Sequence, residues 1–219
     1  MAKKGLFITM EGGEGVGKST NIAVMRKLLE QRGIAINLTR EPGGTKLAER
    51  LRDLLLEVSQ ETVDPISELL MLFAARRQHL CEVILPAIDA GTWVISDRFT
   101  DATYAYQGAG RGMSANLIAQ LESIVQGERR PDYTFLLDAP VSTGMRRAQE
   151  RGELDRFERE KLAFFERVRS NYLQRAAAEP RRFRIINAEH ELAVVQADVE
   201  TQFRPVIERW LEGDDATGK

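Results

Sequence analysis

The sequence has few of the residues that crosslink chains or bind structural metals. It contains one cysteine, Cys81, and two histidines, His79 and His190, in 219 residues. A single cysteine cannot form an internal disulfide, and two distant histidines add little to a site that usually needs several cysteines. Disulfide frameworks and structural zinc are therefore excluded.

Long apolar runs and an excess of positive charge are also missing. No apolar run approaches the roughly 20 residues that span a bilayer, and the apolar stretch near the start is too short for a signal peptide. We therefore expect a cytoplasmic protein without a membrane partner. The formal net charge is −2, whereas surfaces that bind nucleic acid usually carry surplus positive charge, so we expect no nucleic-acid partner.

What is present is an ordinary globular composition with one bias. Hydrophobic residues make up 43% of the chain and charged residues 29%, which is typical of a folded soluble protein. Of the 31 basic residues, 24 are arginine and 7 are lysine. The planar guanidinium group suits paired hydrogen bonds to phosphate. The bias therefore favours a ligand that carries phosphate.

Short apolar runs alternate with amphipathic patterns along the whole chain. The runs predict strands at residues 6–10, 34–39, 93–96, 133–137 and 183–186. The amphipathic patterns predict helices at residues 18–32, 47–56, 65–90, 116–125 and 191–211. Strands that alternate with helices indicate a three-layer α/β fold with a five-stranded parallel sheet flanked by helices.

The helix boundaries and the domain organisation follow from local signals. Gly33 and Gly91 mark helix ends, and Asp64 before Pro65 is a credible N-cap. No linker or break in composition divides the chain. We expect a single domain over residues 1–212 and a flexible tail over residues 213–219.

A glycine-rich segment follows the first predicted strand. Residues 11–20 read EGGEGVGKST and match the pattern GxxxxGK[ST] of a P-loop, between a strand and a helix. Successive backbone N–H groups and the helix N-terminus can cradle a phosphate there. The pattern predicts a site for ATP or a similar nucleotide, formed by Gly12, Gly13, Glu14, Gly15, Val16, Gly17, Lys18, Ser19 and Thr20. Such a loop fits GTPases, motor ATPases and small-molecule kinases, the last of which have a P-loop kinase fold.

Two residues of this loop have specific roles in such sites. Lys18 would reach the β and γ phosphates, and the Ser19 hydroxyl would complete the coordination of Mg²⁺, the expected cofactor. The alternative is a glycine-rich turn without a ligand, which the flanking strand and helix disfavour.

Two further segments come directly after predicted strands, at residues 40–45 and 97–99. In a parallel sheet the carboxyl ends of the strands line the ligand crevice. Asp97 could hold water on Mg²⁺, and Arg98 could bind a second phosphate, that of an acceptor. The alternative is a surface ion pair worth about 0–1 kcal/mol. The GTPase signature NKxD is absent from the sequence, which favours a kinase.

Five segments in a fixed order make the interpretation more specific. EGGEGVGKST, TREPGGT, FAARRQHL, SDRFTDATYAYQGAGRG and RAQERGELDRFE together resemble the bacterial thymidylate kinases. The resemblance covers nearly the whole chain. It implies transfer of the γ-phosphoryl group of ATP to dTMP, giving dTDP and ADP, by a homodimer. The helices at residues 65–90 and 116–125 are candidates for the dimer interface and equally for the core.

The resemblance also implies a set of dTMP contacts. It places Arg98 on the phosphate, Phe73 against the thymine ring and Arg76 at the carbonyl edge of the base. The remaining positions, which face the nucleotide or close the base pocket, are Glu14, Arg40, Thr103 and Gln107.

Three of these assignments have alternatives. Phe73 belongs to an apolar helical stripe, which is more often core than binding surface. Arg77 competes with Arg76, because family members differ in the spacing between the aromatic residue and the arginine; we favour Arg76. Thr103 could lie on a solvated helix face.

A cluster of arginines between residues 146 and 156 resembles the lid that closes over ATP in bacterial thymidylate kinases. We expect the lid at about residues 146–158. Arg151 is the first choice for the arginine that stabilises the transition state, and Arg147 and Arg156 are expected to contact ATP. With Lys18, Asp97 and Arg98, Arg151 completes the expected catalytic set. The alternative is a solvated charged face.

Other functions remain open at this point. The methyl group of thymine is worth only about 1–3 kcal/mol, so a dUMP kinase or a deoxynucleoside kinase is the nearest rival. A P-loop regulatory protein would not need acceptor-side arginines. An ATPase that binds nucleic acid would need a basic aromatic surface.

Overall fold

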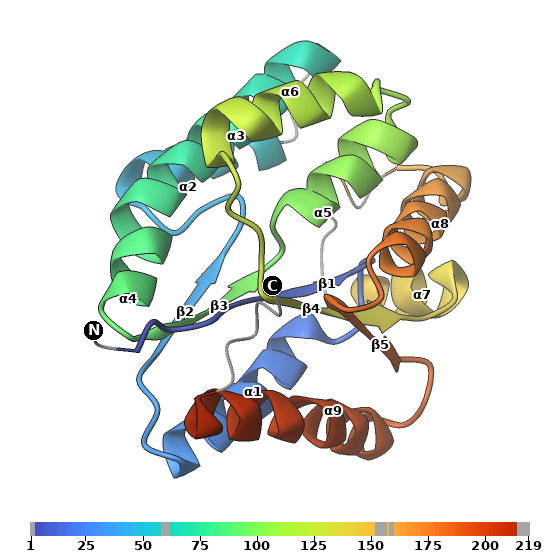
Figure 1. Cartoon of the computed structure of the whole chain (residues 1–219). Helices are drawn as coiled ribbons and strands as arrows, with labels where there is room; N and C mark the ends of the chain where they lie inside the picture. Colours follow the sequence, from blue (N-terminus) through green and yellow to red (C-terminus); the bar gives the residue numbers. More distant parts are fainter. Residues whose placement is uncertain (1–2, 58–61, 152–156, 158–159, 214–219) are drawn as a thin grey trace.

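The computed structural model describes residues 3–57, 62–151, 157 and 160–213. Within them, five strands form one parallel sheet in the order β2-β3-β1-β4-β5 (Figure 1). The strands are β1 (Phe7–Gly12), β2 (Ile36–Arg40), β3 (Trp93–Asp97), β4 (Tyr133–Asp138) and β5 (Phe183–Asn187). The predicted strands are confirmed, with ends that shift by one or two residues.

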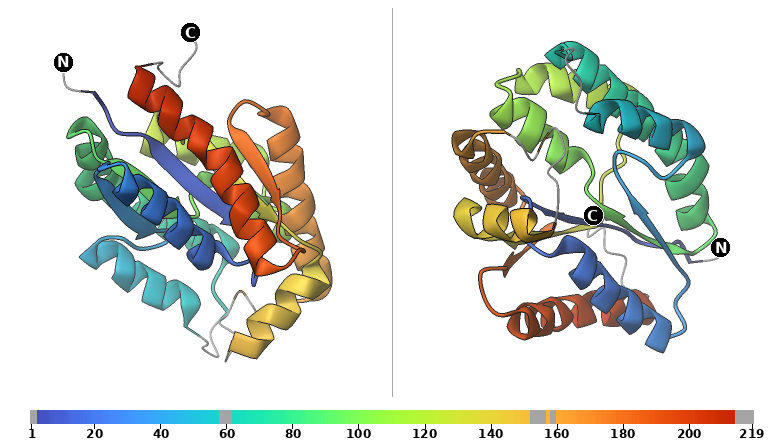
Figure 2. Two further views of the ribbon diagram at one scale, coloured as in Figure 1. Left: turned by 90° about the horizontal axis from the view of Figure 1, so that it is seen from below. Right: turned by 180° about the vertical axis from the view of Figure 1, so that it is seen from behind.

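The helices cover both faces of the sheet. On one face α1 (Lys18–Gln31) and α9 (Leu192–Glu212) lie side by side, as Figure 2 shows. The opposite face is covered by α2 (Lys46–Leu56), α3 (Pro65–His79), α4 (Leu85–Asp89), α5 (Thr100–Thr103), α6 (Ala115–Gln126) and α8 (Leu162–Ala178). The predicted three-layer arrangement is therefore confirmed.

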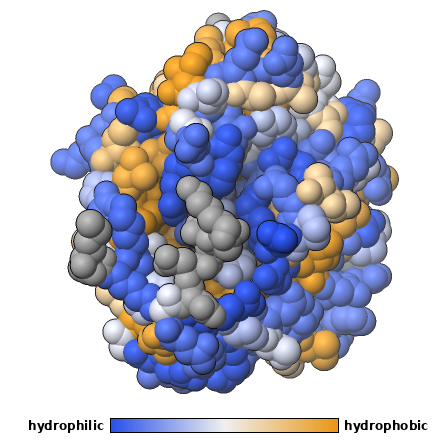
Figure 3. Space-filling view, in the orientation of Figure 1, coloured by the Kyte–Doolittle hydropathy of each residue, from blue (hydrophilic) through white to orange (hydrophobic). Residues whose placement is uncertain are grey.

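Both faces of the sheet are apolar because both are covered. Ile8 and Met10 of β1 point into the core formed with α1 and α9. Phe7, which precedes Ile8 in the alternation, packs with Val94 and Phe99 on the other side. Figure 3 shows hydrophilic residues over most of one outer face, with apolar residues in separate patches. No helix of the described part is both long enough and apolar enough to cross a membrane.

The expected helix at residues 65–90 is interrupted. Asp64 caps its start as predicted, since its Oδ1 accepts the N–H groups of Ile66 and Ser67. After α3 the chain forms a π-helical segment, η1 (Leu80–Ile84), before α4 begins. Pro86 of α4 has no N–H for the carbonyl four residues earlier, and a wider turn accommodates that loss.

Parallel strands bring their carboxyl ends to one edge of the sheet. The P-loop leaves β1 there, and the segments after β2 and β3 leave from the neighbouring strands. A second π-helical segment, η2 (Tyr104–Gly110), extends α5 above the same edge, and α7 (Val141–Arg151) follows β4. The candidate site is built at this edge.

Candidate active site

The P-loop conformation depends on its glycines. Gly12, Gly15 and Gly17 have φ values of 136°, 65° and 90°, a region that residues with a Cβ rarely adopt. At Gly15 a Cβ would also lie 2.0 Å from the carbonyl oxygen of Gly144 in α7. The loop backbone therefore contacts α7 directly, and no larger side chain fits between them.

Lys18 lies at the first position of α1 and folds back over the loop. Its Nζ donates to the carbonyl oxygen of Gly13 at 2.8 Å and, more weakly, to that of Gly12 at 3.3 Å. Burial, and then the charge of Arg98, lower the pKa of Lys18. A phosphate group would relieve both effects, because it supplies negative charge at the ammonium group.

One hollow joins the P-loop to the ends of β2 and β3. Its lining contains most of the residues that the sequence predicts for the ATP phosphates, the metal and the acceptor phosphate. These lining residues are Glu14, Gly15, Val16, Gly17, Lys18, Ser19, Thr20, Arg40, Glu41, Arg52, Asp97, Arg98 and Arg147. Arg156 lies outside the described residues, as does the side chain of Arg151.

The hollow contains oxygen groups that suit a hard cation. Oδ1 of Asp97 is buried and accepts no hydrogen bond from the described residues, and Ser19 lies in the same lining. No three histidine, cysteine, aspartate or glutamate residues of the described part cluster as a complete metal site. The donor set therefore fits Mg²⁺ that also binds phosphate oxygens and water.

Arg98 stands at the junction of this hollow and a second one. Its Nη1 donates to the carbonyl oxygen of Gly12 at 2.8 Å and its Nη2 to Oε1 of Glu14 at 2.7 Å. The guanidinium group lies over the ring of Tyr106, 4.8 Å from its centre, and the Tyr106 hydroxyl donates to the same Glu14 oxygen. Arg98 thus occupies the place expected for a group that binds an acceptor phosphate.

The second hollow adjoins the first at a wall of residues that line both. It shares Glu14, Glu41, Arg52 and Arg98 with the first hollow. Its lining consists of Glu14, Glu41, Pro42, Arg52, Leu56, Leu72, Arg76, Arg98, Phe99, Ala102, Thr103, Tyr106, Gln107 and Phe157. The predicted residues Arg76, Thr103 and Gln107 are therefore brought together.

Buried ion pairs hold Arg76 in this wall. Its Nε donates to Oε2 of Glu41 at 2.7 Å, and Nδ1 of His79 contacts Oε1 of the same carboxylate at 3.0 Å. Nη2 donates to the Thr103 hydroxyl at 3.0 Å. Nη1 of Arg76 is buried without a partner among the described residues. A rigidly held donor that lacks a partner suits a carbonyl group of a ligand.

The neighbours of Arg76 differ from the expectation. Phe73 is 2% exposed, packs with Leu69 and Ile118, and is not part of the wall; Leu72 is. Successive helical residues point about 100° apart, so a shift of one position changes the face. The ring of Phe73 instead lies 5.0 Å from the guanidinium carbon of Arg76. Arg77 points away and donates to the carbonyl oxygen of Val125.

Gln107 closes the far side of the second hollow. Its amide nitrogen donates to Oε1 of Glu68 at 2.7 Å, and both side chains are buried. The amide oxygen of Gln107 takes no part in that bond. This arrangement fixes the side chain where a base could contact it.

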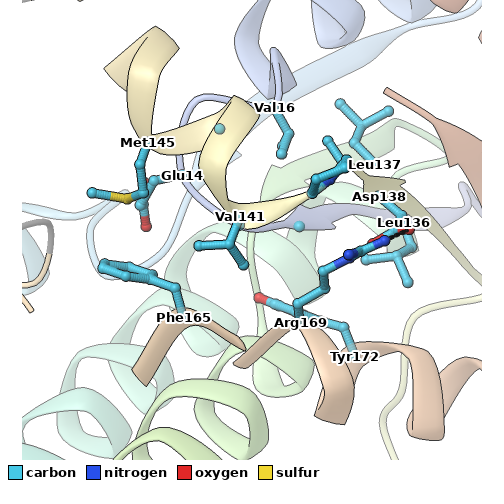
Figure 4. A pocket seen from close by; sticks show the side chains of 15 residues that line it. Glu14, Val16, Leu136, Leu137, Asp138, Val141, Met145, Phe165, Arg169 and Tyr172 are labelled. Carbon is cyan, nitrogen blue, oxygen red and sulfur yellow. Dashed lines mark hydrogen bonds and ion pairs between the residues drawn. The ribbon is translucent and has the colours of Figure 1, made fainter. Parts of the chain in front are cut away.

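α7 and the loop after β5 border the donor side. Arg147 donates from Nη1 to the carbonyl oxygen of Ala188 at 2.8 Å and from Nη2 to that of Glu189 at 3.3 Å. Figure 4 shows a smaller cavity between α7, α8 and the P-loop, walled by residues such as Val141 and Phe165. These contacts tie the expected lid helix to the loop and to the end of β5.

Several residues of the site lack a strong sequence signal. Glu41 follows β2 directly, as Arg98 follows β3, and that position could have identified it. Tyr106 lies between Thr103 and Gln107, the two residues of this segment for which a role was predicted, and has no signal of its own. Arg52 stands in an ordinary amphipathic helix with no distinguishing pattern.

Comparisons with known proteins agree with this geometry. A family model described as "Thymidylate kinase" matches residues 10–199. The chain is 56% identical over 204 residues to the thymidylate kinase of Pseudomonas savastanoi pv. phaseolicola, covering 93% of this chain and 97% of the relative. It is 55% identical over 205 residues to that of Pseudomonas entomophila, covering 94% and 98%.

A solved structure is similar as well. The crystal structure of thymidylate kinase from Ehrlichia chaffeensis matches with a TM-score of 0.73 and 34% identity, over 91% of this chain and 99% of that one. The P-loop, the second hollow beside it and the extent of these matches lead to one conclusion: the chain belongs to the thymidylate kinase family.

Proposed function

We propose that this protein transfers the γ-phosphoryl group of ATP to dTMP, giving dTDP and ADP. The observation that carries the proposal is the shared wall of the two hollows, where Arg98 stands between a P-loop and a second hollow lined by Arg76, Thr103 and Gln107. Phosphoryl transfer needs little covalent chemistry from the protein. It needs two phosphates in line and neutralised charge at that point.

On the donor side, the P-loop backbone would hold the β and γ phosphates. Lys18 would stabilise the negative charge that develops on the transferred group. Ser19 and Asp97 would hold Mg²⁺, directly and through water. When bound, the ion neutralises charge on the phosphates. Arg147 would border the adenosine side through its bonds to residues 188 and 189.

On the acceptor side, Arg98 would bind the dTMP phosphate and Nη1 of Arg76 a thymine carbonyl group. Leu72 would make the ring contact that was first expected of Phe73, because Leu72 lines the pocket and Phe73 does not. Thr103 would act by holding Arg76. The other acceptor contacts proposed are Glu14 and Arg40 toward the sugar and phosphate and Gln107 toward the base.

A lid over about residues 146–158 would bring Arg151 to the transferring group, with Arg156 on ATP. Within this range, residues 152–156 and 158 lie outside the described part, and Arg156 is one of them. The proposal for the lid therefore rests on the family resemblance.

We also propose a cytoplasmic homodimer. The outer surfaces of α3 and α6 carry exposed apolar side chains, with Ile66, Leu70 and Ile124 exposed by 46%, 50% and 77%. Burying such a surface against a second copy would be favourable. Light scattering on the purified protein gives the mass that tests this proposal.

The activity is tested by coupled detection of ADP with ATP, Mg²⁺ and a panel of acceptors. We expect dTMP to give the highest kcat/KM, dUMP less, and thymidine and purine monophosphates only background. Background ADP release with dTMP would refute the proposal. A higher kcat/KM with dUMP than with dTMP would identify dUMP, and not dTMP, as the preferred acceptor.

A further inference from the structure

Glu11 is a buried carboxylate outside both substrate hollows. It is the last residue but one of β1, whose residues are all buried, and is itself 0% exposed. Burial, and then the charge of Asp101, raise the pKa of Glu11 to about 8. A carboxylate buried at such a cost is usually satisfied by specific partners. The two partners of Glu11 both lead to Arg98.

The first partner fixes the backbone of Arg98. Oε1 of Glu11 accepts the N–H of Phe99, the next residue, at 2.7 Å. Arg98 itself has a φ of 73°, a left-handed conformation that is unfavourable for residues with a Cβ. Such a conformation persists where the surroundings fix it.

Two further bonds fix the same turn. The Arg98 N–H donates to the carbonyl oxygen of Met10 at 3.0 Å. The Ser96 hydroxyl donates to the Arg98 carbonyl oxygen at 2.7 Å. Of these three bonds, the one from Glu11 is the one made by a side chain of another strand, β1. It therefore sets the direction in which the Arg98 side chain leaves β3.

The second partner reaches the guanidinium group of Arg98. The hydroxyl of Tyr172, on α8, donates to Oε2 of Glu11 at 2.8 Å and accepts from Nη1 of Arg98 at 3.3 Å. Tyr172 is 1% exposed and extends from α8 on one side of the cavity beside the P-loop (Figure 4). Glu11 is thus linked to both ends of Arg98, to its backbone through the N–H of Phe99 and to its guanidinium group through Tyr172.

The other charges near Glu11 are occupied elsewhere. Asp101 accepts from Nε of Arg175 at 2.6 Å and from Nη1 of Arg182 at 2.6 Å. Although burial alone would raise the pKa of Asp101, these arginines hold it below its ordinary value. Arg175 and Arg182 pair with Asp101, whereas the hydrogen bonds of Glu11 lead to Arg98.

We propose that Glu11 and Tyr172 are positioning residues that orient Arg98 toward the phosphate of the acceptor nucleotide. This inference rests on the proposed function, in which Arg98 binds that phosphate. Neither residue would touch a substrate. Their contribution would pass entirely through Arg98, and this dependence is what distinguishes positioning from general support of the core.

A double-mutant cycle measures that dependence. Tyr172→Phe and Glu11→Gln are each made in the wild-type protein and in Arg98→Ala, and dTMP binding is measured by calorimetry besides KM and kcat. We expect each single substitution to weaken dTMP binding about tenfold, because it alters a hydrogen bond in the network that holds Arg98, with KM for ATP changed less than about twofold. In the Arg98→Ala background we expect less than a twofold further change.

Thr9→Val is the matched control. Thr9 lies two residues before Glu11 on β1, is 0% exposed, and its hydroxyl bonds only that of Thr134 among the contacts of the described residues. We expect it to lower thermal stability and leave dTMP binding unchanged. If Glu11→Gln fails to fold, the cycle with Tyr172→Phe decides alone.

The outcomes separate the two proposals. Wild-type protein that neither binds dTMP nor turns it over would refute the proposed function and, with it, this inference. Wild-type protein that turns over dTMP while the substitutions add fully to Arg98→Ala, or have no effect on dTMP binding, would overturn the inference alone.

Discussion

The donor side and the acceptor side of the site are built in different ways. The donor loop is one continuous segment, residues 12–20, and its shape is set by the backbone of its glycines. The acceptor pocket is assembled from side chains on the P-loop, on α2, α3, α5 and η2, on the segments after β2 and β3, and from Phe157. A binding loop can thus be encoded locally, whereas a pocket that reads a base depends on the whole fold.

The two sides also differ in how their charges are balanced. Among the described residues, the hydrogen bonds of Lys18 go to backbone carbonyl groups and not to a carboxylate. Arg76 is already paired with Glu41 inside the protein, at side-chain exposures of 3% and 4%. Removing a charge from the donor side should therefore cost activity, whereas removing one from the acceptor side should also cost stability.

The largest effect is expected at Lys18. Lys18→Ala should lower kcat by at least about 10³-fold, because the charge that develops on the transferred group loses its counterion. The melting temperature should stay close to that of the wild type. Steady-state kinetics and thermal melting measure both, with Lys27→Ala, an exposed lysine of the same helix, as the control. Retained dTDP formation would contradict the P-loop assignment.

Arg151 tests whether the donor side needs a lid. Arg151→Ala should lower kcat by at least about a hundredfold with little change in dTMP affinity, since a transition-state arginine acts late in the reaction. Arg146→Ala is the control, because Arg146 forms an exposed pair with Glu150. A near-normal kcat would move the role to Arg147 or Arg156.

Glu41 tests the acceptor side. Glu41→Gln keeps a hydrogen-bond acceptor but leaves the buried Arg76 without its counterion, and should lower the free energy of unfolding by about 2 kcal/mol. KM for dTMP should rise as well. The control is Glu49→Gln, whose pair with Arg40 is exposed and should be worth at most about 1 kcal/mol. Urea denaturation of both variants gives the comparison; equal losses would mean that burial does not matter here.

The same contrast explains how much the sequence could predict. Strands and helices are visible as local periodicity, and the donor loop is a contiguous motif, so both can be read without knowledge of the tertiary structure. Their ends are less certain, as η1 shows, because a proline changes the hydrogen bonding of the helix without changing its apolar pattern.

The acceptor side follows only in part. The resemblance named Arg76 and Gln107, which line the pocket, but it did not show which face of α3 meets the pocket. It therefore named Phe73 for the ring contact, whereas Leu72 lines the wall. Tyr172 and Glu11 are 161 positions apart in the chain and meet only in the folded protein. No local pattern records such a contact, and it becomes visible only when β1 and α8 are placed together.

The smallest effects should separate two adjacent residues of α3. Leu72→Ala should raise KM for dTMP by about three- to tenfold, because it removes apolar contact from the pocket wall. Phe73→Leu should leave that KM within about twofold and lower the free energy of unfolding by about 1 kcal/mol, because it reduces packing against Leu69 and Ile118.

Each of these variants serves as the control of the other, since the two positions share one helix turn and face different surroundings. Kinetics measures the effect on the pocket and urea denaturation the effect on the core. A rise in KM for Phe73→Leu alone would place the thymine ring against Phe73 after all. It would then follow that α3 rotates when dTMP binds, because Phe73 is 2% exposed without it.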